Sequence, residues 1–500
     1  METSEVVREP PIVLPGRPLA TDPPLKHRIC WSSRTSTTAK SASRLGARHR
    51  GMPRHALEAR ARHHRWKWRS GGTTPQGSDA TMPPMRVHSL PLRRASRSVL
   101  LAFALTLVIL AASPTRAEQR TLEVRETAGI RRFGYPVAAF LELRESVSAA
   151  TRFRLLHNGR PVEAQIRAIA GQDGRIVGAT IDFEGSFLPL EVRRYTLEMG
   201  TDVPAAAEPA GGLSVRESAD GFRVANGSQI EYLVPRKLES ILGSVKTRER
   251  EWIAPGGSGL WILARDGSRV RVGGEQVASR IVKEGPVSCG LHFERSNLGG
   301  ALEGVTARLE LETPRSKSWL RVDCAVEDPR GLVAGLHAEL SLALGDGPTL
   351  LDFGAGSLVY AVLAKDQTAV LEAGQVSREA PSADTPAWKV LRGAETLEPY
   401  VTGPAPGKGA APEGWAHVMD ASRCTAVAVD EFAHGHADSI KVQASGRLEI
   451  ARRFASATND AQPGVKRLRF WLHFVSMPPH VGAVTSPQSM LAPLEAHWRE

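Results

Sequence analysis

The chain has 500 residues and a mass of 54.0 kDa, and 64 Lys and Arg residues against 53 Asp and Glu residues give a formal net charge of +11. This length exceeds one ordinary core and predicts about two to four domains. Residues 1–117 hold 20 basic and 6 acidic residues, which leaves 44 and 47 for residues 118–500, a net charge of −3. General polyanion binding by residues 118–500 is therefore excluded, and 42% apolar residues indicate a globular chain rather than a disordered or membrane-embedded one.

Residues 85–117 have the three regions of a secretory signal peptide. Four arginines precede an apolar run over residues 99–112, and Thr115-Arg116-Ala117 supplies a small-residue cleavage site. The apolar run is shorter than the ~20 residues that a membrane-spanning helix needs, which favours a cleaved signal peptide over the alternative, an uncleaved membrane anchor. We therefore expect a secreted or periplasmic protein with no stable membrane insertion after cleavage.

A signal peptide belongs near the start of a chain, so we expect translation to begin at Met82 or Met85. Residues 1–84 would then be a disordered basic segment from a mispredicted start. The competing interpretation is a basic, aromatic-interleaved arm for nucleic acid, as in residues 63–69. That interpretation conflicts with export, and nucleic acid is not an expected partner.

From residue 118 the apolar residues alternate with a period of two, which is typical of strands. Asn158-Gly159 stands between two such runs and predicts a hairpin. We expect a compact all-β domain over residues 118–200. Residues 201–212, rich in Ala, Pro and Gly, predict a linker.

Residues 213–482 continue in short alternating runs, with a further Asn-Gly hairpin signal at Asn226-Gly227. Some 270 residues of antiparallel strand predict a large two-sheet sandwich, because one open sheet of that size would leave a face and long edges unburied. Residues 403–414 predict a flexible insertion loop. Residues 483–500 are expected to form a C-terminal tail that connects to a further domain.

The cysteines after the leader are Cys289, Cys324 and Cys424, an odd number that allows at most one internal disulfide. Cys289 and Cys324 fall in neighbouring predicted strands and could pair. The alternative is three small buried thiols.

Motifs of standard catalytic and cofactor sites are absent from the sequence, so no cofactor is expected. Gly407-Lys408-Gly409 lacks the spacing of a phosphate loop. His434 and His436 have the one metal-like spacing, since residues two apart on a strand share a side. Gly435 suits a turn equally well, and the expectation is no metal, with these two histidines as a weak candidate.

Several short motifs resemble the exo-rhamnogalacturonan lyase (YetA-like) family. In the first domain they are Arg132-Phe-Gly-Tyr-Pro-Val137, His157-Asn-Gly-Arg-Pro-Val-Glu-Ala-Gln165 and Arg194-Tyr-Thr-Leu197, and in the second Val224-Ala-Asn-Gly227, Lys283-Glu-Gly-Pro286, Ser318-Trp-Leu-Arg-Val322 and Gly414-Trp-Ala-His-Val418. The resemblance covers about residues 120–482. It implies a small RIFT-type β-barrel followed by an antiparallel sandwich of the galactose-mutarotase and lyase supersandwich kind.

The resemblance also implies a contact with an acidic, pectin-like polysaccharide. That family carries an α/α-toroid after the sandwich, and this chain stops where it would begin, so a partner chain carrying a helical toroid is an expected possibility. Two functions stay open: a non-catalytic carbohydrate-binding protein, and an active or partner-completed polysaccharide lyase acting by β-elimination.

Catalytic residues stay unassigned. A lyase needs a cation for the uronate carboxylate, a base and an acid, but Tyr135, Tyr195 and Tyr232 fall in predicted strands, where packing is their expected role. The candidate sugar-binding residues are Trp388 and Trp415 as aromatic platforms, with His417, Arg452, Arg453 and His473 as a basic group. The alternative is that the tryptophans are interior and the other four are scattered polar residues.

Overall fold

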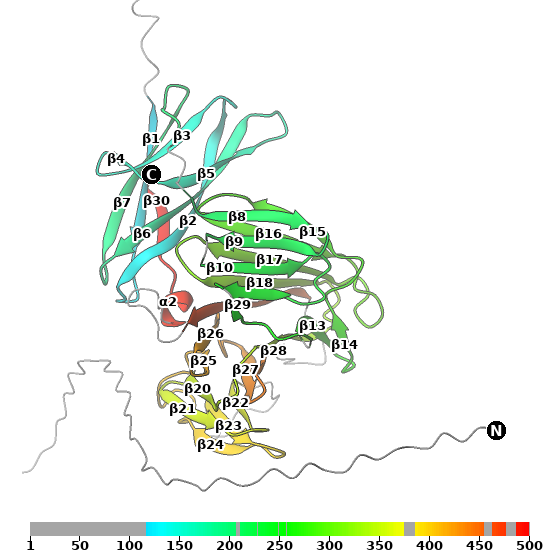
Figure 1. The fold of residues 1–500 in the computed structure, drawn as a ribbon. Coiled ribbons are helices and arrows are strands. Elements are labelled where there is room, and N and C mark those ends of the chain that lie inside the picture. Colours follow the sequence, from blue (N-terminus) through cyan, green and yellow to red (C-terminus); the bar gives the residue numbers. More distant parts are fainter. Residues whose placement is uncertain are drawn as a thin grey trace, which may run out of the picture. The chain divides into compact units, whose positions relative to one another are not determined.

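The computed structural model describes residues 117–499, apart from 207–210, 228, 249, 257, 375–385, 455–462 and 477–486. The predicted signal peptide and the expected start at Met82 or Met85 lie outside the described residues. No helix among the residues described is long and apolar enough to cross a membrane. The prediction of an all-β protein is confirmed (Figure 1).

The first domain consists of two antiparallel sheets that face each other across one core. One sheet has the order β30-β1-β7-β3-β4 and the other the order β2-β6-β5. Alternate residues of both sheets, such as Leu122, Ile181 and Leu197, fill the core because successive side chains of a strand point to opposite faces. The strands are β1 (Glu118–Arg125), β2 (Arg132–Val147), β3 (Arg152–His157), β4 (Arg160–Pro161), β5 (Ala164–Ala170), β6 (Ile176–Phe187), β7 (Val192–Gly200) and β30 (Glu495–Arg499).

These two sheets differ from the expected small barrel, because the pairings found in the described residues leave them as separate sheets. The predicted hairpin at Asn158-Gly159 is present between β3 and β4. Asn158 has φ 51° and Gly159 has φ 74°, the left-handed conformation that a tight hairpin turn requires.

The last described strand belongs to the first domain, where residues 483–500 were expected to form a tail that connects to a further domain. Helix α2 (Pro487–Leu491) is followed by β30, which pairs antiparallel with the edge of β1 from Thr121–Arg499 to Arg125–Glu495 (Figure 1). Trp498 packs against the core, and its Nε1 donates to the carbonyl of Phe140 at 2.7 Å. Periodicity missed this strand because it is short and half-exposed.

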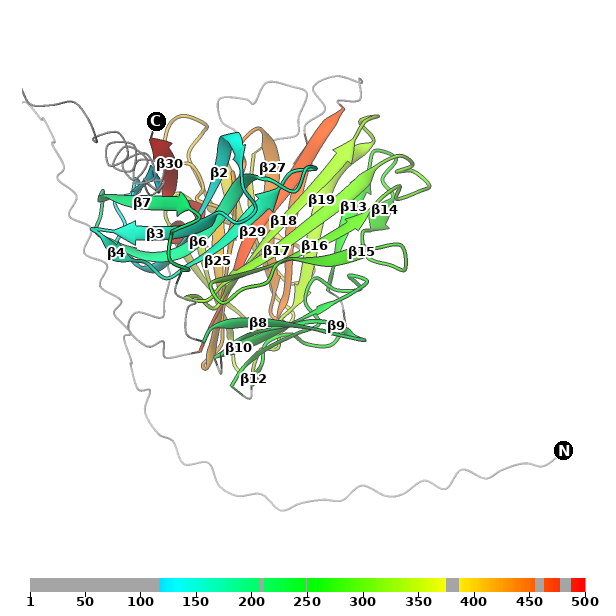
Figure 2. The ribbon, with the colours of Figure 1, turned by 90° about the horizontal axis from the view of Figure 1, so that it is seen from above.

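The region expected to form the sandwich contains three antiparallel sheets around one large core (Figure 2). A five-stranded sheet has the order β12-β11-β10-β9-β8. Its strands are β8 (Leu213–Ser218), β9 (Gly221–Asn226), β10 (Ile230–Pro235), β11 (Ser244–Thr247) and β12 (Arg250–Glu251).

An eight-stranded sheet has the order β14-β13-β19-β28-β27-β22-β23-β24. Its strands are β13 (Gly259–Ala264), β14 (Arg269–Arg271), β19 (Val333–Ser341), β22 (Thr368–Ala373), β23 (Trp388–Gly393), β24 (Glu398–Thr402), β27 (His436–Gln443) and β28 (Arg447–Phe454).

A nine-stranded sheet has the order β15-β16-β17-β18-β29-β26-β25-β20-β21. Its strands are β15 (Ala278–Lys283), β16 (Ser288–Arg295), β17 (Thr306–Pro314), β18 (Trp319–Asp328), β20 (Thr349–Gly354), β21 (Leu358–Leu363), β25 (Trp415–Met419), β26 (Arg423–Val429) and β29 (Gly464–Ser476). Residues such as Leu311, Val322 and Phe470 face the core, and the residues between them form an outer face that carries many charged side chains.

Of the two alternatives for Cys289 and Cys324, the disulfide is not present: both thiols are free and buried. Strand β17 lies between their strands, with Thr313 opposite Cys289 and Leu309 opposite Cys324. The alternative of buried thiols is therefore the correct one for this pair, and burial raises the pKa of each to about 12.

Candidate functional site

A pocket of about 250 Å³ lies where the first domain meets the outer face of the nine-stranded sheet. It lies just below the range of about 300–1,000 Å³ typical of small-molecule sites, so it suits one small ligand unit. Strands β2 and β6 supply one wall, β16, β17, β18 and β29 supply the floor, and the segment of α2 supplies a third side. The lining includes Tyr135, Asp182, Glu312, Trp319, Arg321 and Trp471.

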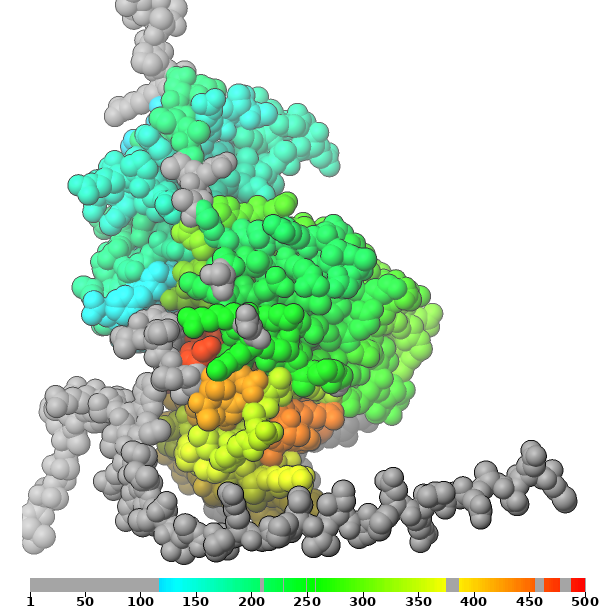
Figure 3. Space-filling model, viewed as in Figure 1, coloured from blue at the N-terminus to red at the C-terminus, as the bar shows by residue number. Residues whose placement is uncertain are grey.

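Three aromatic rings form the apolar part of the pocket. Tyr135 meets Trp319 edge to face, with ring centroids 5.6 Å apart, and Trp471 belongs to the same cluster. Met490 of α2 packs against these rings. In the space-filling view the red surface of this C-terminal segment lies beside the orange surface of β25 and β26 (Figure 3).

Tyr135 is held by the segment that follows the sandwich. Its hydroxyl donates to the carbonyl of Ser489 at 2.6 Å, and the guanidinium of Arg132 stacks 4.7 Å from its ring centre. Arg132 itself donates to the carbonyls of Ser489 and Ala492 and pairs with Glu126 at 3.0 Å. Burial raises the pKa of Tyr135 to about 12, so the phenol stays protonated at neutral pH.

The polar part of the pocket is centred on Glu312. Lys283 Nζ lies 2.7 Å from Glu312 and 2.8 Å from Asp182, Ser288 Oγ donates to Glu312 at 2.9 Å, and Arg321 Nη2 donates to its second oxygen. Asp182 comes from β6 of the first domain, so Lys283 ties this domain to the sandwich.

Neighbouring positive charges determine the ionisation state of Glu312. Burial alone would raise the pKa of Glu312, but Arg321 and Lys283 outweigh it and lower the pKa to about 2. Burial also raises the pKa of Asp182 above its usual value, although Lys283 opposes that shift. Glu312 therefore stays ionised at all ordinary pH values.

A second ion-pair group borders the pocket on β29. Arg469 donates to Asp323 at 2.9 Å and to Asp430 at 3.2 Å. Burial raises the pKa of Asp430. Two cations of the lining, Arg321 and Arg469, thus stand beside a wall of aromatic rings, and Lys283 adjoins the pocket through its ion pair with Glu312.

Arg321 is the cation best placed for a ligand. Its side chain is 37% exposed, against 20% for Lys283 and 29% for Arg469. Its Nη2 is engaged by Glu312, and its Nε is buried without a hydrogen-bond partner among the residues that the structure describes. A guanidinium has five N–H donors, so the exposed part of this side chain can still donate to a carboxylate or a hydroxyl.

The structure places the tryptophans named from the sequence in the interior. Trp388 is 4% and Trp415 is 6% exposed, so neither ring presents the platform that the sequence analysis expected. Trp388 Nε1 donates to the carbonyl of Ala410 at 3.4 Å, and Trp415 Nε1 donates to Glu413 at 2.7 Å. Gly354, opposite Trp415, leaves room for the indole, because a Cβ there would collide with it.

The expected basic group is not brought together. Arg452 and Arg453 are neighbours on β28 and therefore point to opposite sides of the eight-stranded sheet. Arg452 is 3% exposed and binds both oxygens of Asp438 at 2.9 Å, whereas Arg453 is exposed. His417 and His473 lie on the nine-stranded sheet, both opposite Ala426, with His473 buried and His417 half-buried.

The two histidines with metal-like spacing do not converge. The backbone N–H of His434 donates to Glu431 in a turn, while His436 begins β27 with its Nδ1 3.1 Å from Asp438. No group of three or more His, Cys, Asp or Glu side chains among the described residues is arranged to hold a metal ion.

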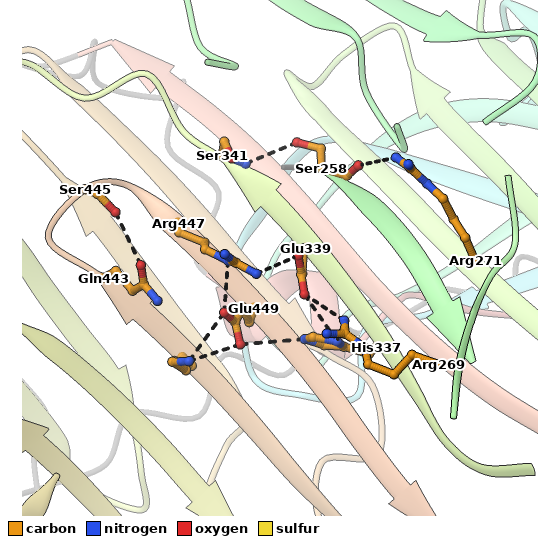
Figure 4. A network of polar contacts seen from close by, with 11 residues as sticks. Ser258, Arg269, Arg271, His337, Glu339, Ser341, Gln443, Ser445, Arg447 and Glu449 are labelled. Atoms are coloured by element: carbon orange, nitrogen blue, oxygen red, sulfur yellow. Dashed lines mark hydrogen bonds and ion pairs between the residues drawn. The ribbon is translucent and has the colours of Figure 1, made fainter. Parts of the chain in front are cut away.

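A further polar cluster covers part of the outer face of the eight-stranded sheet (Figure 4). Glu339 and Glu449 are directly opposite each other, and Arg447 pairs with both, at 2.9 and 3.0 Å. His337 lies between the two carboxylates, 3.4 Å from Glu339 and 3.7 Å from Glu449. The hydrogen bond with His337 contributes most to lowering the pKa of Glu449 to about 2. These charges compensate one another, and we assign the cluster to stability.

No site role was assigned from the sequence to the residues in and beside the pocket, although signals for them existed. Tyr135, Lys283 and Arg321 each stand inside a motif that carried the family resemblance. Glu312 gives no local signal, because its partners lie on β15 and β18 and meet it only through strand pairing.

No protein-family model and no curated protein matches the chain. Among solved structures it is similar to a glycosyl hydrolase family 38 protein from Enterococcus faecalis, with 10% identity over 80% of this chain and 50% of that one and a TM-score of 0.48. An alpha-mannosidase from Enterococcus faecalis V583 has 11% identity over 80% of this chain and 48% of its own, with a TM-score of 0.47.

A galactose mutarotase related enzyme from Lactobacillus acidophilus has 11% identity over 52% of this chain and 98% of that one, with a TM-score of 0.30. The chain thus spans about half the length of the two Enterococcus proteins. The fold of this chain is established by its own strand pairings.

Proposed function

We propose that this chain is an exported protein that binds an acidic, pectin-like polysaccharide, with one acidic sugar unit in the pocket between the first domain and the nine-stranded sheet. The proposal rests on one observation: the side chain of Arg321, 37% exposed, lines a pocket of about 250 Å³ together with the edges of Trp319 and Trp471, which are 3% and 8% exposed. The carboxylate of an acidic sugar suits a guanidinium fork, and the apolar ring edges border the space beside it.

Binding calorimetry with oligogalacturonate and rhamnogalacturonan fragments tests this function. Arg321→Gln removes the exposed cation, and we expect about tenfold weaker binding, the scale of a lost charge-assisted hydrogen bond. Arg308→Gln is the matched control, because Arg308 is 39% exposed on the neighbouring strand β17 and lies outside the pocket lining. Equal affinity of both variants and the wild type would exclude the pocket as the acidic-sugar site.

A second candidate function, β-elimination from a uronate, has one supporting observation. The protonated phenol of Tyr135 lies in the same pocket as two cations, the groups that a lyase uses as an acid and for charge neutralisation. Incubation of the chain with rhamnogalacturonan, followed by the absorbance of unsaturated uronate, tests it. Product formation that Tyr135→Phe abolishes would support the lyase, and binding without product would leave the binding function alone.

A further inference from the structure

The outer face of the nine-stranded sheet carries a second group of exposed side chains, far along the sheet from the pocket. Tyr360 on β21, Asp352 on β20 and His417 on β25 are directly opposite one another in the register of these three strands. Residues opposite each other on paired strands point to the same side, with Cβ atoms about 4.5–5.5 Å apart. We call these three residues the tyrosine patch.

The chemistry of the tyrosine patch combines one aromatic ring with a polar pair. Tyr360 is 50% exposed, whereas Tyr135, Tyr195 and Tyr232 are at most 4% exposed. His417 Nδ1 lies 3.5 Å from Asp352 Oδ2, and both side chains are about one-fifth exposed. The ring of His417 lies 5.1 Å from that of Trp415, which limits its movement.

Strand β24 of the eight-stranded sheet lies beside β21 and borders the tyrosine patch. Tyr400 on β24 donates its hydroxyl to the carbonyl of Tyr360 at 3.3 Å, and Arg392 stacks 5.0 Å from the Tyr400 ring. Tyr400 is 46% exposed, so a second ring and a cation border the patch. The bond to the Tyr360 carbonyl also occupies an acceptor of the edge strand β21, which disfavours the addition of a strand from another protein there.

The patch and the pocket share one face of one sheet. A row of opposite residues runs from Leu358 through Gly354, Trp415, Ala428 and Trp471 to Arg321, beside the row that holds Tyr360. Four strand spacings separate Asp352 from Arg321, about 19 Å at the usual spacing of strands. Between them, Met490 and Leu491 of α2 pack on Trp415 and Trp471.

We infer that the tyrosine patch is a second saccharide subsite, which takes a neutral or acidic sugar unit of the same polysaccharide chain whose acidic unit fills the pocket. The inference rests on the proposed function and deepens it: the ligand is a polymer that passes α2 and contacts the sheet at two points. The ring of Tyr360 stacks on one sugar face, Asp352 accepts from sugar hydroxyls, and Arg392 attracts the acidic chain. A long chain then binds more tightly than a short fragment because its second contact is intramolecular.

The test compares two ligands, a short acidic oligosaccharide and a long rhamnogalacturonan chain, with calorimetry on the full protein. For Tyr360→Ala, which removes the aromatic anchor, we expect at least about tenfold weaker binding of the long chain and unchanged binding of the short fragment. For His417→Ala, which removes the ion-pair partner of Asp352, we expect a weaker binding of the long chain and again no change for the short fragment. Phe140→Ala is the matched control, since this ring is 55% exposed on the first domain. Thermal unfolding of each variant checks the fold.

The outcomes separate this inference from the proposed function. If both patch variants bind the long chain like the wild type while Arg321→Gln binds it weakly, the second subsite is wrong and the pocket stands. If the wild type binds neither ligand, the proposed function fails and the subsite with it. If Tyr360→Ala instead converts a dimer into a monomer in sedimentation velocity, the patch is an interface between copies and the inference is overturned.

Discussion

Glu312 shows how single residues hold the pocket together. Its carboxylate accepts from Lys283, Arg321 and Ser288, and through Lys283 it is linked to Asp182 of the first domain. For Glu312→Gln we predict a loss of about 1–3 kcal/mol in the free energy of unfolding, because two cations lose their shared anion. Urea unfolding measures it, with Glu310→Gln, 58% exposed on the same strand, as the control expected within about 0.5 kcal/mol of the wild type. An equal effect in both variants would contradict the assignment.

Acid should destabilise the protein through the same carboxylate. The pKa of Glu312 is about 2 in the folded protein against an ordinary value of 4.5, and that of Glu449 is shifted in the same way. A lowered folded pKa contributes stability that is fully present above pH 4.5 and is lost as the pH falls toward 2. We predict a falling free energy of unfolding between these pH values, with a shallower fall in Glu312→Gln. Denaturant unfolding at several pH values measures it, and an identical slope in both proteins would contradict it.

Among the elements, β30 has the clearest structural role. It covers the edge of β1 and carries Trp498 against the core of the first domain. For Trp498→Ala we predict faster amide hydrogen exchange in β1 and β30, because the strand loses its side-chain anchor and the donor to Phe140. Val465→Ala, at a 62% exposed position of β29, is the control and should leave exchange in β1 unchanged. Unaltered exchange in Trp498→Ala would show that backbone pairing alone holds β30.

The strands also show which features of the fold hydrophobic alternation can predict. Alternation and the Asn-Gly signals predicted the strands on either side of Asn158 and Asn226 because these are local properties of the chain. Pairing partners are not local: β17 separates the cysteines that looked adjacent, and β30 pairs with a strand more than 360 residues earlier. Burial of Trp388 and Trp415 depends on such distant partners, so single-sequence patterns could not separate an exposed platform from an interior ring.

At the scale of the whole molecule, the pocket depends on contributions from both ends of the described chain. Tyr135 and Asp182 come from the first domain, Glu312 and Arg321 from the nine-stranded sheet, and Met490 from α2. The sequence motifs contain part of this set of residues. The residues come together in space only because strands that are distant in the sequence pair with one another. Accordingly, the fold class was predictable from alternation, whereas the pocket required the register of β15, β17 and β18.

Hydrogen–deuterium exchange of the wild-type protein, with and without an acidic pectin oligosaccharide, is the decisive experiment for the pocket as the acidic-sugar site. We expect slower exchange in residues 133–137 and in the strands that carry Glu312 and Arg321, because the ligand covers the pocket that these segments line. Saturating binding with no protection in these segments, or protection confined to other sheets, would contradict it.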